Sequence, residues 1–204
     1  MKKNAMGQQP SEKMQQWEQM KERVSRMVDR LGKPVDKGIA ETIIVLNLLG
    51  IPTRQSCAGH LKWGVGAPWV DIESKDKKIQ ELMEKERSFI KMANKRREEQ
   101  GGKITNEVAK LYTRAHRYSL QAKKRHAVIH QRLLDFLATF YQDRIVPYDV
   151  QLIAYLRGNS TMLESHGAGL QDVTPLPLRK ERLAAYQQEM RDFTAFLKQR
   201  FFEG

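Results

Sequence analysis

One long helical segment constrains the fold of this chain more than any other feature of its sequence. From residue 105 to about residue 141, apolar side chains recur at helical spacing along a single side of the segment. They are Val108, Leu111, Ala115, Ala122, Ile129, Leu133, Leu137 and Phe140. A second, charged helix is expected over residues 75–99, and two glycines break the chain between them, at Gly101 and Gly102. The sequence therefore predicts a helical hairpin over residues 75–142, inserted into the rest of the fold or projecting from it.

Most of the net charge lies in this hairpin. Residues 75–132 hold 17 Lys and Arg against 7 Asp and Glu, which accounts for 10 of the 12 net positive charges. Between Glu107 and Asp135 no acidic residue occurs, although a solvated helical face normally mixes both signs. At about 100° per residue, the cations of the long helix fall on one stripe opposite its apolar side. We call this stripe, with its neighbour Gln121, the basic ridge; its cations are Lys110, Arg114, Arg117, Lys124, Arg125 and Arg132.

The basic ridge is the candidate nucleic-acid interface of the chain. Cations at this spacing can follow phosphates and release their counterions, and Tyr118 beside the ridge could stack on a base. The alternative interpretation is a solvated helix on a basic protein. A membrane surface is not the expected partner, because a basic interfacial helix needs an exposed apolar side, and the apolar side here is expected to face the core.

Amphipathic helices are predicted at both ends of the chain. Residues 1–10 are polar and are expected to form a disordered leader before the first helix. That helix should begin near Ser11, with apolar residues three and four apart at Trp17, Met20, Val24, Met27 and Leu31. The C-terminal helix repeats this spacing at Leu183, Tyr186, Met190, Phe193 and Leu197. The two helices are expected to pack on each other or on a second subunit, which would make a homo-oligomer.

A small sheet is predicted between these helices. Asp36 stands at the expected N-cap of a buried helix that ends at Gly50 and Pro52. Short strands are expected over residues 53–57 and 69–73, joined by a Gly-rich loop, and over residues 148–156 and 162–165. The predicted fold is therefore α/β and α-rich, with a single domain over residues 11–204.

The cysteine content indicates the compartment. Cys57 is the single cysteine, so an intrachain disulfide is excluded. No apolar run that could act as a signal peptide or membrane span follows Met1. The expected compartment is a reducing cytoplasm.

The loop after the first predicted strand carries candidate site residues. Cys57 and His60 are three apart, so they could bind a metal ion, or His60 could lower the pKa of Cys57 and produce a thiolate. The alternative is a buried cysteine that packs as a small apolar residue. His126 and His130 lie four apart on the apolar side of the long helix and could complete a zinc site, or be satisfied core histidines.

A run of matching residues surrounds this loop. It consists of Asp36-Lys37-Gly38-Ile39, Leu46-Asn47, Thr53, Ser56-Cys57-Ala58-Gly59-His60 and Trp69-Val70. This run resembles the N-terminal part of the tRNA wybutosine-synthesising protein 3 family, with His60 where the family has Arg. The resemblance covers residues 36–70, and residues 75–204 contain no counterpart of the later segments of that family. A Gly-Ile-x-Thr-x-x-Ser-Cys-x-Gly-His string also resembles uncharacterised bacterial and phage proteins, which implies no function.

The resemblance implies an RNA-modification setting. Members of that family methylate a tricyclic guanosine derivative in tRNA with S-adenosylmethionine, which makes S-adenosylmethionine a cofactor implied by resemblance. Carried over by position, it implies a ligand pocket around the loop. The candidate catalytic residues are Asp36, Cys57 and His60, and the candidate ligand-binding residues are Ser56, Gly59, Trp69 and Asp71.

These observations leave three hypotheses about function. The first is a nucleic-acid-binding protein of tRNA-modification type, with RNA expected as partner before DNA. The second is a non-enzymatic interaction protein that uses the basic hairpin and the terminal helices. The third is a metal-binding regulator with Cys57, His60, His126 and His130 as candidate ligands. No Walker lysine motif or dinucleotide-binding glycine motif occurs, so the sequence assigns no reaction by motif.

Overall fold

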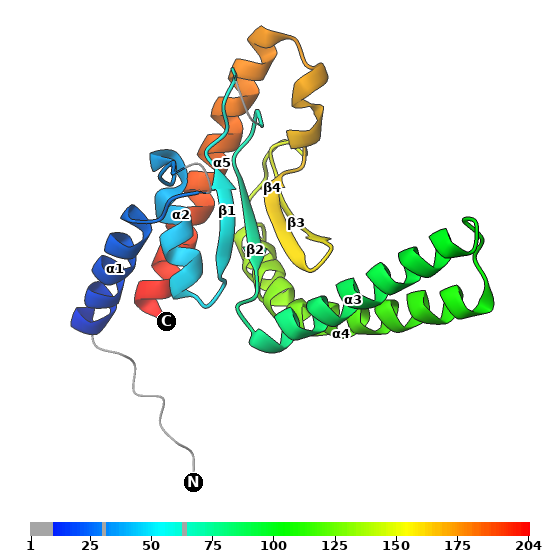
Figure 1. Cartoon of the computed structure of the whole chain (residues 1–204). Helices are drawn as coiled ribbons and strands as arrows, with labels where there is room; N and C mark the ends of the chain where they lie inside the picture. The colour runs from blue at the N-terminus through cyan, green and yellow to red at the C-terminus, as the bar shows by residue number, and fades with distance from the viewer. Residues whose placement is uncertain (1–9, 30–31, 63–64) are drawn as a thin grey trace.

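The computed structural model describes residues 10–29, 32–62 and 65–204. The chain forms an α-rich α/β fold, as the hydrophobic periodicity predicts (Figure 1). Its elements follow in the order α1 (Pro10–Ser25), α2 (Lys37–Leu48), β1 (Thr53–Cys57), β2 (Trp69–Glu73), α3 (Lys77–Glu99), α4 (Asn106–Phe140), β3 (Leu152–Arg157), β4 (Ser160–Ser165), the 3-10 helix η1 (Ala168–Val173) and α5 (Leu176–Glu203).

Four antiparallel strands form one sheet in the order β1-β2-β4-β3. The register gives the sheet two distinct ends. At one end Cys57 pairs with Trp69, which pairs with Glu164; at the other end Ile72 pairs with Thr161. The loop with the candidate site residues leaves the sheet at the first end, and α3 begins four residues beyond β2 at the second end.

The main core lies between one face of this sheet and the helices α1, α2, α4 and α5. Val70, Ile72 and Leu163 are fully buried on that face because adjacent strands bring them side by side. The α2 helix is buried along most of its length, as its apolar composition predicts. The C-terminal half of α4 joins this core through Leu133 and Leu137.

The terminal helices pack against each other within the same chain. Trp17 of α1 contacts the rings of Phe201 and Phe202 of α5, with ring centroids 6.5 and 5.7 Å away. Lys13 adds a hydrogen bond of 3.2 Å from Nζ to the carbonyl oxygen of Phe202. The terminal helices thus pack on each other, as expected, and the homo-oligomer stays a prediction.

The first helix is shorter than its periodicity predicts. It begins at Pro10 and ends at Ser25, whereas the apolar spacing continues to Leu31, which lies outside the described residues. The predicted leader covers residues 1–10; Pro10 instead starts the helix, and residues 1–9 lie outside the described residues. A turn replaces the last helical turns: Val28 pairs with Pro34, and the N–H of Asp29 donates to the carbonyl of Lys33 at 2.8 Å. Proline cannot continue the helical hydrogen bonds, which favours this turn.

The α3–α4 hairpin extends away from the sheet (Figure 1). Gly101 and Gly102 both have positive φ angles, of 67° and 83°, and form the turn between the arms. Small buried side chains at Ala93, Ala115 and Ala122 allow the two helices to pack closely. The hairpin predicted from the sequence is confirmed.

The second strand pair also forms, with a shorter first strand than predicted. β3 starts at Leu152 rather than at residue 148, because the N–H groups of Val150 and Gln151 donate to the carbonyl of Pro147 and close a turn there. A two-residue connection that includes Gly158, with φ of 64°, joins β3 to β4. Within the described ranges, no helix is both long and apolar enough to cross a bilayer.

Candidate functional site

Asp36, Cys57 and His60 come together at one end of the sheet. Their potential ligand atoms, a carboxylate oxygen, a sulfur and a ring nitrogen, all lie within 4.8 Å of one another. Asp36 Oδ2 lies 3.1 Å from His60 Nε2. The three residues proposed as catalytic from the sequence thus form one cluster, which we call the Asp-Cys-His cluster; their catalytic role stays a prediction.

The position of Asp36 explains how this cluster is built. It occupies the N-cap of α2, but its side chain accepts no hydrogen bond from that helix. Asp36 Oδ2 instead accepts a hydrogen bond of 3.1 Å from the backbone N–H of Ala58. The carboxylate therefore ties the start of α2 to the loop that follows β1.

Gly59 holds the tight turn of this loop. Its φ angle of 81° is in the left-handed region that favours glycine. A Cβ atom at this position would lie 2.7 Å from the carbonyl carbon of Ala67 and 2.7 Å from Cδ1 of Leu183. Gln187 of α5 secures the same turn, because its Nε2 donates to the carbonyl of Ala58 at 2.9 Å. The backbone of this turn thus requires glycine at position 59, and the predicted ligand-binding role of Gly59 stays a prediction.

The electrostatics of the cluster do not produce a thiolate. Burial raises the pKa of the Cys57 thiol, and the negative charge of Asp36 raises it further, although the N–H of Gly59 donates to Sγ. Burial also opposes ionisation of Asp36, but the Ala58 N–H and His60 outweigh it and lower the pKa of this carboxyl. The surroundings of Cys57, burial first and Asp36 after it, thus favour the neutral thiol, and activation of Cys57 by His60 stays a hypothesis.

The candidate ligand-binding residues are divided between two faces of the sheet. Trp69 is the register partner of Cys57 and lies beside the cluster. Ser56 pairs with the core residue Val70, and adjacent strand residues point to opposite faces, so its side chain lies on the other face from Cys57. Asp71 is buried and ion-paired with Arg54, with 3.0 Å between Nε and Oδ2. Ligand binding by these residues stays a prediction.

The four candidate zinc ligands of the sequence do not meet. His126 Nε2 and His130 Nδ1 both bond Thr161 Oγ1, at 2.9 and 3.1 Å. Thr161 belongs to the end of the sheet opposite Cys57, because β2 and β4 run antiparallel with Ile72 beside it. This register excludes a site that combines Cys57 and His60 with the two helix histidines. His126 and His130 instead each bond Thr161 through one ring nitrogen, and the other ring nitrogen of His126, Nδ1, is buried without a partner among the described residues.

The basic ridge is present and exposed on α4. All six of its cations are exposed, along one uninterrupted helix. Arg125 is partly neutralised, because its Nη1 lies 3.0 Å from Oδ2 of Asp76. Arg132 lies against the end of α2, where its guanidinium comes close to Gly50. The outer part of the ridge, Lys110, Arg114 and Arg117, projects with the hairpin.

Tyr118 is already stacked within the hairpin. Its ring lies against Phe89 of α3, with centroids 5.6 Å apart and an interplanar angle of 21°. Lys85 Nζ lies 5.8 Å from the Tyr118 ring centroid, and the Arg114 guanidinium lies 6.0 Å from that of Phe89. With Arg117 and Gln121, these rings line a shallow hollow of about 270 Å³. Stacking of Tyr118 on a base remains a prediction, and in this structure Phe89 covers one side of the ring.

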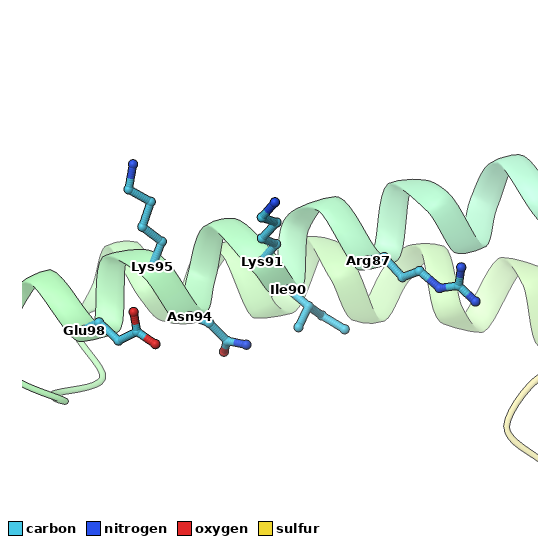
Figure 2. Close-up of a pocket in the computed structure, with 6 residues that line it drawn as sticks. All are labelled: Arg87, Ile90, Lys91, Asn94, Lys95 and Glu98. Carbon is cyan, nitrogen blue, oxygen red and sulfur yellow. The ribbon is translucent and has the colours of Figure 1, made fainter.

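The α3 arm carries a second set of cations that sequence reasoning missed. Arg87, Lys91 and Lys95 are exposed and line a hollow along α3 together with Ile90, Asn94 and Glu98. In Figure 2 the Lys91 and Lys95 side chains extend from one side of the helix, away from Ile90 and Asn94. Residues 87–97 contain no acidic residue. The spacing of four residues between these cations and the absence of Asp and Glu around them could have identified this set from the sequence.

Comparisons with known proteins add no assignment. No family model, curated protein or solved structure matches this chain. The resemblance to the tRNA wybutosine-synthesising protein 3 family stays an expectation carried by residues 36–70.

The two candidate sites lie at opposite ends of the sheet. β2 runs from Trp69, beside the Asp-Cys-His cluster, to Glu73, and α3 starts shortly after it. A five-residue strand spans about 16 Å. A ligand at the cluster and a polymer on the hairpin would therefore be bound by separate surfaces, which allows each to be tested without disturbing the other.

Proposed function

We propose that this chain binds nucleic acid, with RNA as the expected class, through the α3–α4 hairpin. The observation that carries the proposal is the pair of acid-free basic stretches, residues 87–97 and 108–134, on the two arms of one hairpin. Like charges on one surface repel each other, and a polyanion relieves this repulsion. A face that only needed to be soluble would mix both signs.

The length of the hairpin supports a polymer rather than a small anion. From Lys110 to Lys124 the helix axis advances about 21 Å, at 1.5 Å per residue. Duplex nucleic acid presents a charge about every 1.7 Å of its axis, so several phosphates fit within that length. Exposed Lys and Arg side chains are long and can adapt to the backbone of such a partner.

The stacked rings give the basic surface a rigid base. Phe89 and Tyr118 hold the two arms in contact, and Arg114 lies above the Phe89 ring. A guanidinium held over a ring is pre-organised for a phosphate, since less side-chain freedom is lost on binding. The tRNA-modification setting within this proposal depends on the resemblance of residues 36–70, and so does the preference for RNA.

A salt titration tests the proposal. Fluorescence anisotropy would follow binding of the full chain to mixed tRNA, single-stranded RNA and duplex DNA at several salt concentrations. The test variant changes Lys110, Arg114, Arg117 and Lys124 to Gln; Arg125 is left because it is paired with Asp76. The matched control changes four exposed cations elsewhere, Lys21, Arg23, Lys180 and Arg191, to Gln.

Hairpin binding has a defined signature in this experiment. Each lost phosphate contact lowers the slope of log K against log salt by about 0.7 to 0.9, so the test variant should lose about 3. The control variant has the same net charge and should keep the slope of the wild type. Equal slopes in both variants, or no binding by the wild type near physiological salt, would contradict the proposal.

A further inference from the structure

We infer that Asp36, Cys57 and His60 form a zinc-binding site with an open fourth coordination position. The inference does not depend on the proposed nucleic-acid binding, because the cluster and the hairpin lie at opposite ends of the sheet. Within residues 10–29, 32–62 and 65–204, these three form the one group of three or more metal-ligating side chains gathered closely enough for an ion.

The donor atoms match the chemistry of zinc. A thiolate sulfur, an imidazole nitrogen and a carboxylate oxygen are its usual protein ligands, with bonds of about 2.3, 2.0 and 2.1 Å. In a tetrahedron with such bonds the donor atoms lie about 3.3 to 3.7 Å apart. The 3.1 Å between Asp36 Oδ2 and His60 Nε2, and the limit of 4.8 Å for all three atoms, need only small side-chain shifts.

The surrounding backbone holds the three ligands in place. Asp36 is fixed by the Ala58 N–H, and the N–H of His60 donates to the carbonyl of Val65 at 3.0 Å. Cys57 ends β1 and is held in the sheet by Trp69. A site of this kind is supported by rigid elements on both sides, which favours a defined coordination geometry.

The exposure of the cluster allows an ion to enter and a ligand to reach it. The His60 side chain is 24 % exposed and that of Asp36 is 34 % exposed, while Cys57 is partly buried. On binding, the Sγ–Zn bond forms as the S–H bond of Cys57 breaks, and the proton passes to solvent. No fourth His, Cys, Asp or Glu of the described chain joins the cluster, so one position remains for water or an anionic oxygen or sulfur donor.

The open coordination position distinguishes this site from a structural zinc site. Structural sites are usually closed by four protein ligands, whereas three ligands with an exchangeable water are typical of catalytic sites. Zinc lowers the pKa of a bound water to about 7, which would make a hydroxide available beside Trp69. The ligand class expected here is therefore a small molecule with an oxygen or sulfur donor.

Zinc chloride and cobalt chloride are the probes that test the inference. Isothermal titration calorimetry of metal-free full-length protein should give one zinc ion per chain. Cobalt in the same site should show visible d–d bands of tetrahedral strength and a thiolate charge-transfer band in the near ultraviolet. The variants are Cys57→Ser and His60→Gln, with His116→Gln, an exposed histidine of α4, as the matched control.

The expected loss is specific to the cluster. Cys57→Ser and His60→Gln should each weaken zinc binding at least about 100-fold, since even residues that only support metal ligands contribute 10- to 100-fold. Cys57→Ser should also remove the charge-transfer band, while His116→Gln should change neither readout. Circular dichroism checks that each variant is folded. Absence of zinc binding by the wild type, or affinity unchanged in both cluster variants, overturns the inference.

Discussion

Thr161 connects two histidines of α4 to the edge of the core. Its hydroxyl lies 2.9 Å from His126 Nε2 and 3.1 Å from His130 Nδ1, and both Thr161 and His126 are fully buried. A hydroxyl carries one proton and two lone pairs, so it can bond both rings at once. A single residue of the sheet thus gives each of two helix histidines a partner for one ring nitrogen.

Replacing this hydroxyl should destabilise the fold. Thr161→Val keeps the shape of the side chain but leaves ring nitrogens buried without a partner, which costs about 1–3 kcal/mol. Thr161→Ser keeps the hydroxyl and serves as the control, since it loses only a methyl group. Urea denaturation measures the free energy of unfolding of each, and a Val variant as stable as the wild type would show that the hydrogen bonds contribute little.

The same histidines predict a dependence of stability on pH. Burial lowers the pKa of His126, as does the nearby His130, while Asp71 acts in the opposite direction; burial also lowers the pKa of His130. In the unfolded chain both histidines take up protons around the ordinary pKa of 6.5. Below about pH 6.5 the unfolded state binds more protons than the folded state does. The free energy of unfolding is therefore expected to fall as the pH falls below this value.

Denaturation at several pH values between about 7 and 5.5 measures this loss. The double variant His126→Gln and His130→Gln should show a smaller fall in the free energy of unfolding over this range. The double variant can be less stable at every pH, so the comparison concerns the slope alone. An equal slope in both proteins would assign the pH dependence to other groups.

Gly59 should tolerate no side chain. In Gly59→Ala a new Cβ atom meets Ala67 and Leu183 at 2.7 Å, and the φ angle of 81° is itself unfavourable. Gly158→Ala is a matched control, because its φ angle is 64° but nothing lies within 4 Å of the added atom. Both variants pay about 1–2 kcal/mol for the backbone conformation, and Gly59→Ala should be further destabilised by the clash.

Thermal denaturation compares the two glycine variants, and zinc titration of Gly59→Ala reports on the Asp-Cys-His cluster. We expect a lower midpoint and weaker zinc binding for Gly59→Ala than for Gly158→Ala. Equal midpoints would mean that the loop can move away from Ala67 and Leu183 without cost.

At the scale of elements, the α3–α4 hairpin has two basic arms with different neighbours. The α4 arm continues into the core through Leu133 and Leu137, whereas α3 packs on α4. Arg87, Lys91 and Lys95 of α3 therefore contribute charge without a part in the main core. These three exposed side chains can therefore be replaced without opening a cavity in the core.

Removing these three charges tests whether both arms bind. The variant Arg87→Gln, Lys91→Gln and Lys95→Gln should lower the salt slope for tRNA by about 2, at 0.7 to 0.9 per contact. Three Gln substitutions at Lys21, Lys180 and Arg191 provide the control with equal charge. An unchanged slope in the α3 variant would restrict the interface to the basic ridge of α4.

At the scale of the whole molecule, the terminal helices close the core within one chain. Trp17 is 5 % exposed and packs on two rings of the last helix. Trp17 and Val24 of the first helix are thus buried within the chain. The seam between α1 and α5 brings residues more than 180 positions apart into contact.

Trp17→Ala should therefore destabilise the single chain. Loss of a buried Trp side chain costs about 3–5 kcal/mol, since it leaves a cavity against Phe201 and Phe202. The midpoint of thermal unfolding should be lower than that of the wild type and independent of protein concentration for both. A midpoint that rises with concentration would show that the seam is shared between subunits.

The sequence by itself determined the features that depend on near neighbours. Helical periodicity identified α4 and α5, paired glycines identified the hairpin turn, and the absence of acids between Glu107 and Asp135 identified the basic ridge. These features are local, because a helix places residues three and four apart on one face whatever surrounds it. Helical periodicity also predicted that the first helix continues to Leu31. It ends at Ser25 instead, because periodicity takes no account of the turn between Val28 and Pro34.

The tertiary structure alone decided what depends on residues far apart in the chain. Strand order and register placed Thr161 with His126 and His130, and separated those histidines from Cys57 by the length of the sheet. The return of α5 onto α1 placed Phe201 and Phe202 against Trp17. Asp36 joined Cys57 and His60 because its carboxylate bonds a loop 22 residues further on instead of capping its own helix. Such contacts depend on how the elements pack, and spacing along the sequence does not encode that packing.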